Sequence, residues 1–155
     1  MSIALGLHVL SVVVWVGGMF FAYMCLRPAA VEVLEPPLRL QLWVAVFRRF
    51  FPFVWAAVIL ILAAGYWMFF ARFGGFANPQ MPLYIHIMQG LGIVMVLIFM
   101  HVFFAPYRRL RRAVEAADWP AGGKALAQIR MLVGLNTTIG LVVVAIASGG
   151  RYLIH

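Results

Sequence analysis

Four long runs of apolar residues, separated by short polar stretches, set the pattern of this chain. Each run has about 20 residues or more, which as an α-helix is enough to cross roughly 30 Å of hydrocarbon. The runs occupy residues 3–26, 50–71, 82–105 and 131–150, and they contain no Asp, Glu, Lys or Arg. The pattern predicts an all-α integral membrane protein, a four-helix bundle that forms a single domain over residues 1–155.

The polar stretches predict how the spans are connected. Residues 34–42, which include Glu35 and Arg39, are expected to form a short helix in the membrane interface. Residues 118–123 read Asp-Trp-Pro-Ala-Gly-Gly and predict a turn, after which residues 124–130 lead into the fourth span.

Composition agrees with a membrane location. Hydrophobic residues make up 66% of the chain and charged residues 10%, against roughly 25% charged in soluble domains. The net charge of +8 does not indicate a nucleic-acid partner, because the basic residues lie in short loops as membrane topology requires. The single cysteine, Cys25, excludes an internal disulfide.

The distribution of Lys and Arg predicts the orientation. By the positive-inside rule, the two basic loops are cytoplasmic and both termini are periplasmic, in the inner membrane of a bacterium. The first span lacks the basic region that precedes the apolar core of a signal peptide, and we expect it to be retained. Ten of the twelve basic residues lie in these two loops: Arg27, Arg39, Arg48, Arg49, Arg108, Arg109, Arg111, Arg112, Lys124 and Arg130.

Histidines are the only side chains inside the spans that titrate near neutral pH. His8 lies ~7 Å below the outer end of the first span, and His86 lies at a similar depth in the third. Two imidazoles at matched depth on neighbouring helices are what a b-type haem needs as axial ligands. The alternative is that each histidine reaches the interface and hydrogen-bonds water in a purely structural subunit.

The surroundings of the two histidines fit a flat ring. Ser11 and Trp15 share the face of His8 at helical spacing, as does Met19, and Gly90 follows His86 by one turn. Arg151 lies on the same side and is a candidate partner for a haem propionate. The first hypothesis is therefore a haem b protein that exchanges electrons with quinone or a periplasmic partner, or carries out a haem-dependent oxidation.

Methionines support a second hypothesis, copper. Thioether and imidazole groups suit Cu(I), and the copper site would use His8 and His86 with Met81 and Met88 at the same predicted periplasmic mouth. His86 and Met88 would point about 200° apart on a regular helix, however. Methionine in an apolar span is also a common packing residue.

The remaining polar residues give less information about the function. His101 lies ~22 Å further along the third span than His86, where it could bind a second haem, relay a proton or hydrogen-bond Asn136; we favour the hydrogen bond. The Gly17-Gly18 pair permits a homodimer contact. A proton-coupled transporter is disfavoured, because all four acidic residues lie outside the spans: Glu32, Glu35, Glu115 and Asp118.

Two segments carry a resemblance to a known family. The stretches LHVLSVVVWVGGMFFAYMCLRP, residues 7–28, and LVGLNTTIGLVVVAIASGGRY, residues 132–152, resemble the opening and closing helices of the CopD family of bacterial inner-membrane proteins. This resemblance implies a role in copper resistance or uptake. The chain is more faintly similar to the HemJ-type protoporphyrinogen oxidases, small four-helix proteins that bind b-type haem. Their third helix carries a His-x-Lys pattern, where this chain has His86-Ile87-Met88.

Overall fold

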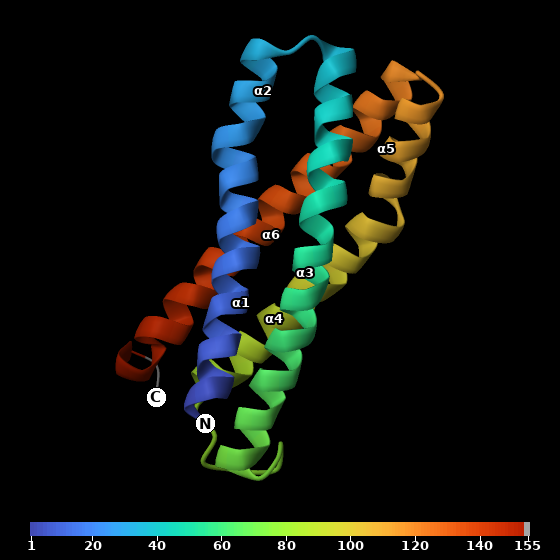
Figure 1. Ribbon diagram of the computed structural model, residues 1–155. Helices are drawn as coiled ribbons and strands as arrows, with labels where there is room; N and C mark the ends of the chain where they lie inside the picture. Colours follow the sequence, from blue (N-terminus) through green and yellow to red (C-terminus); the bar gives the residue numbers. More distant parts are fainter. Residues whose placement is uncertain (154–155) are drawn as a thin grey trace.

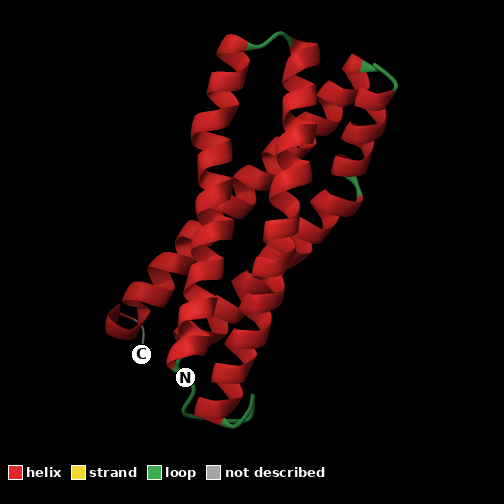
Figure 2. Cartoon of the chain, viewed as in Figure 1, coloured by secondary structure: helices red, strands yellow, loops and turns green. Residues whose placement is uncertain are grey.

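The computed structural model describes residues 1–153, with the side chains of Arg151 and Leu153 outside the description. Within this part of the chain the regular structure is entirely helical (Figures 1 and 2). Four helical segments are long and apolar enough to cross a membrane, which confirms the predicted all-α architecture. In chain order the elements are α1 (Ser2–Phe21), η1 (Ala22–Leu26), α2 (Arg27–Val33), α3 (Pro36–Phe73), α4 (Leu83–Phe104), α5 (Pro106–Glu115) and α6 (Trp119–Leu153).

Two predicted connections are wrong, both because helices begin earlier than expected. Residues 36–42 form no separate interfacial helix; they are the first turns of α3, since prolines at the start of a helix lose no backbone hydrogen bond. The predicted turn at 118–123 is shorter, because the Asp118 carboxylate accepts the Ala121 N–H at 3.2 Å and caps α6. The reversal occurs at Ala117, whose φ of 52° is left-handed.

Asp118→Ala is expected to destabilise the protein by about 0.5–2 kcal/mol, because the first turn of α6 loses its only recorded side-chain cap. Thermal unfolding in mild detergent measures the change. Glu115→Ala is the matched control, since Glu115 is also exposed and acidic but makes no recorded hydrogen bond. Equal effects of the two substitutions would show that Asp118 acts through its charge rather than as a cap.

Most of each spanning helix faces outward. Only 17–28% of the most apolar window of each span is buried within the protein, so lipid must cover the rest. The buried core is rich in aromatic rings where α3, α4 and α5 meet. There, Phe51 packs edge-on against Phe99 at 5.6 Å and against Tyr107 at 4.8 Å between ring centroids. Trp15 of α1 joins the same core through Phe99.

Helix pairing follows the positions of glycines. α1 runs beside α3 in the opposite direction (Figure 1), and Gly18 lies against the Phe50 ring. α6 meets α1 and α4 at Gly140, where an added Cβ would lie 3.0 Å from Val16 Cγ2 and 3.1 Å from Met95 Cε. Close approach of backbones at small residues is a common way for helices to associate in membranes.

One widened turn interrupts the first spanning helix. At η1 the Arg27 N–H bonds the Ala22 carbonyl five residues back instead of four, which is a single π-helical turn. The Tyr23 ring of this turn lies against α6 at Gly134, where an added Cβ would be 2.8 Å from Tyr23 Cε2. Arg27 begins α2 directly beyond it.

Candidate functional site

His8 lies between α1 and α3, half-buried. Its Nδ1 is 3.1 Å from the Ile61 carbonyl oxygen. Because a carbonyl can only accept a hydrogen bond, Nδ1 carries the proton, and in the neutral imidazole the lone pair is then on Nε2. Metal-binding histidines are commonly oriented by such a bond from the other ring nitrogen. The imidazole is thus held in the tautomer that leaves Nε2 free to bind a metal.

Gly65 makes room for the imidazole on α3. A Cβ at this position would lie 3.2 Å from His8 Cε1 and 3.4 Å from Nδ1, tighter than ordinary contact. Met68 follows on the same face of α3, since seven residues after Ile61 bring a helix to within about 20° of the same direction. Met68 is partly buried and lies about 4.5 Å beyond Gly65 along the helix axis. Met68 is therefore a candidate thioether on this side of α3.

Two residues predicted to share the face of His8, Ser11 and Trp15, make contacts of their own within the protein. Ser11 and Trp15 are both buried. The Ser11 hydroxyl donates to the Leu7 carbonyl at 2.7 Å, within its own helix. Trp15 contacts the Phe99 ring edge-on at 6.1 Å between centroids. Both side chains belong to the packing beneath His8.

The residues predicted on the third span lie apart from His8. His86 is exposed on α4, and Gly90 borders open space, with nothing within 4 Å of an added Cβ. Met81 is buried just before α4, and Met88 is partly buried on it. The structure thus places His8 against α3 and leaves His86 on an outer surface. The side chain of Arg151 lies outside the described residues.

A central cavity lies deeper in the bundle. Its volume is about 320 Å³, and Trp15, Met19, Phe51 and Asn136 are among its lining residues. Asn136 donates from Nδ2 to the Met95 carbonyl at 3.2 Å, while its buried Oδ1 has no hydrogen-bond partner. Sequence reasoning did not identify this cavity, because its wall is almost wholly apolar and resembles ordinary core.

The hydrogen bond predicted between His101 and Asn136 is wrong. Asn136 bonds Met95 instead, and His101 is exposed. Six residues separate Met95 from His101, which places them about 120° apart around α4. His101 therefore points away from the α6 contact that Met95 makes.

Within residues 1–153 no group of three or more His, Cys, Asp or Glu side chains forms a cluster that could hold a metal ion. Cys25 is exposed and unpaired. A metal site at His8 would therefore need donors other than such a cluster, and imidazole with thioether is a combination that suits Cu(I).

Comparison with known proteins identifies the family. The family model described as CopD, copper resistance protein D, matches residues 44–149, about two thirds of the chain. The match begins within α3 and ends near the end of α6, so it leaves α1 and His8 outside. No curated protein and no solved structure matches the chain. The four spanning helices and the family match together make this chain a multi-pass inner-membrane protein that belongs to the CopD family.

Proposed function

We propose that the protein binds Cu(I) within the membrane and takes part in copper resistance or copper transfer across the bilayer. The observation that carries the proposal is the match to the copper resistance family over residues 44–149. It supports copper as cargo, in agreement with the second of the two sequence hypotheses.

The bond from His8 Nδ1 to the Ile61 carbonyl supports His8 as one ligand of the proposed site, and Met68 is the proposed second ligand. The free Nε2 of His8 and the Met68 thioether come from neighbouring helices, and both donors suit a soft, monovalent copper ion. No carboxylate lies in the spans, which favours Cu(I) over harder divalent ions. The copper site predicted from the sequence, His8 and His86 with Met81 and Met88, is less favoured because His86 is exposed on α4.

The test is a titration of the purified protein in mild detergent with Cu(I) against a chromophoric competitor. We expect saturable binding, because the imidazole is already oriented by its bond to Ile61. Competing Zn²⁺ in excess should displace little Cu(I) from an imidazole–thioether site. Failure to bind Cu(I) would overturn the proposal.

Haem is retained as a second candidate on one observation, the bond from His8 Nδ1 to a backbone carbonyl, which would equally orient an axial ligand. In that case the second ligand predicted from the sequence is His86, which would have to turn inward from the outer surface of α4, and quinone or a periplasmic protein would exchange the electrons. A dithionite-reduced spectrum of the same samples separates the two. Sharp α and β bands without Cu(I) binding would favour haem, and a featureless spectrum with Cu(I) bound would favour copper.

A further inference from the structure

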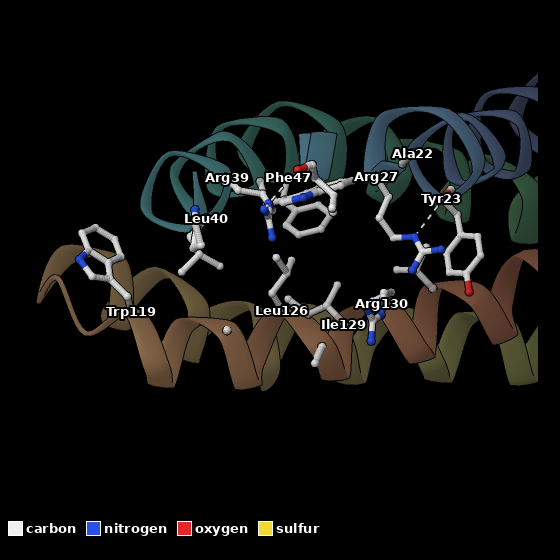
Figure 3. A pocket seen from close by; sticks show the side chains of 16 residues that line it. Ala22, Tyr23, Arg27, Arg39, Leu40, Phe47, Trp119, Leu126, Ile129 and Arg130 are labelled. Atoms are coloured by element: carbon white, nitrogen blue, oxygen red, sulfur yellow. Dashed lines mark hydrogen bonds between the residues drawn. The ribbon is translucent and has the colours of Figure 1, made fainter. Parts of the chain in front are cut away.

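A second cavity lies at the basic end of the bundle, opposite the N-terminus (Figures 1 and 3). Its volume is about 230 Å³, and it is enclosed by η1 and α2, the first turns of α3 and the first half of α6. Three arginines line it, Arg27, Arg39 and Arg130, and none of the lining residues is acidic. The protein therefore gathers three positive charges around one space without compensating them.

Arg39 is the most constrained of the three. One terminal nitrogen donates to the Leu34 carbonyl at 3.0 Å and reaches the Val31 carbonyl at 3.4 Å, which holds the guanidinium in place. Its Nε is buried and has no hydrogen-bond partner. Leaving a donor of a charged group buried and unpaired is costly, so an acceptor is expected beside it.

Arg27 and Arg130 lie on other walls of the cavity, and their guanidinium groups have N–H donors without a partner. The widened turn at η1 sets Arg27 over the Tyr23 ring, with 4.6 Å from the guanidinium carbon to the ring centroid. Arg27 Nε donates to the Tyr23 carbonyl at 3.4 Å, and the structure records no hydrogen bond for the Arg130 side chain. Each guanidinium carries five donors, so most remain available to an anion.

The rest of the wall is apolar. Figure 3 shows Leu40, Phe47, Leu126, Ile129 and Trp119 along the cavity. Trp43 also lines it. Tryptophan is enriched at the level of lipid headgroups. A small inorganic anion would satisfy the arginines but leave this apolar surface unfilled. An amphiphile with an anionic head and a hydrocarbon chain fits both parts.

We propose that this cavity binds an anionic phospholipid. Its phosphate lies against Arg27, Arg39 and Arg130, and an acyl chain follows the wall formed by Leu126 and Ile129. Arginine pairs with phosphate through charge-assisted hydrogen bonds, and basic pockets between membrane helices are a known form of anionic lipid site. The proposal is independent of copper, because none of these residues contacts the His8 region.

The test compares lipid binding by delipidated, full-length protein in detergent, using native mass spectrometry with phosphatidylglycerol and phosphatidylcholine. We expect phosphatidylglycerol to be retained. Arg39→Gln and Arg130→Gln should each weaken its binding roughly tenfold or more. The matched control is Arg112→Gln, which removes one exposed positive charge from α5 outside the cavity and should leave binding unchanged.

Three results would overturn the proposal. Equal retention of phosphatidylcholine would show that the headgroup charge is not recognised. Equal losses in all three arginine variants would show general attraction to a basic surface. Full competition by inorganic phosphate at the same concentration would show a soluble-anion site. If Arg39→Gln fails to fold because its bond to Leu34 is lost, Arg130→Gln decides, since Arg130 makes no recorded hydrogen bond within the protein.

Discussion

Replacing His8 with alanine is expected to weaken Cu(I) binding by about 100-fold or more. Loss of a residue that only orients a metal ligand already costs roughly 10–100-fold in affinity, and removal of the ligand itself should cost at least as much. Competitive titration of the detergent-purified variant measures the loss. The matched control is His101→Ala, since His101 is exposed on α4 and its side chain makes no recorded hydrogen bond.

A second substitution tests whether the orientation of the His8 imidazole matters for Cu(I) affinity when every donor atom is kept. Gly65→Val removes no donor atom. It adds a side chain whose Cβ would lie 3.2 Å from His8 Cε1. The imidazole must then move from the Ile61 carbonyl, and Cu(I) affinity should fall roughly tenfold. Unchanged binding in both His8→Ala and Gly65→Val would remove His8 from the site. A loss in His86→Ala instead would transfer the site to the end of α4.

Gly18→Leu is expected to destabilise the fold by about 1–3 kcal/mol, because the added side chain overlaps the Phe50 ring of α3. The ring can shift toward the central cavity that it lines, which limits the loss to this range. Gly17→Leu is the matched control. Gly17 is exposed, with nothing within 4 Å of an added Cβ, and the two variants share the same change in helix propensity.

Thermal or denaturant unfolding in detergent measures both glycine variants. A stability difference confined to Gly18→Leu would establish the α1–α3 contact that also holds His8. Equal stability of the two variants would contradict the close approach of these helices. A loss confined to Gly17→Leu would indicate instead that this outer face meets a second copy, as the predicted homodimer contact requires.

The spans could be predicted from the sequence because hydropathy over about 20 residues reports directly on the solvent that a helix must meet. Their ends could not, since they depend on local capping. Asp118 caps α6 and the prolines at 36 and 37 open α3, and both act on single turns. The orientation of the bundle and the similarity to the HemJ-type oxidases stay predictions.

The site was harder to predict, because helix pairing leaves little trace in one sequence. His8 and His86 lie at similar predicted depths, yet α1 packs along α3, so the nearest partner of His8 is the Ile61 carbonyl. A backbone acceptor has no sequence pattern of its own. The fit of Gly65 to an imidazole is likewise invisible until the two helices are in contact.

The cavity lined by three arginines was also hard to predict from the sequence. Arg27 and Arg39 lie more than ninety positions from Arg130 in the chain, and all three count equally in the positive-inside rule. Topology thus accounts for their presence without indicating that they converge. What distinguishes them from the exposed arginines of α5 is that they line one cavity, in which the Nε of Arg39 is buried and unpaired.

The length of α3 bears on how the protein is positioned in the membrane. Its 38 residues extend about 57 Å, nearly twice the hydrocarbon layer. Only residues 50–71 of α3 are free of charge, and as a helix they extend about 33 Å, which matches one hydrocarbon layer of ordinary thickness. The first turns of α3, which carry Arg39, Arg48 and Arg49, must therefore extend beyond the hydrocarbon, and the neighbouring tryptophans fix the helix at the level of the headgroups.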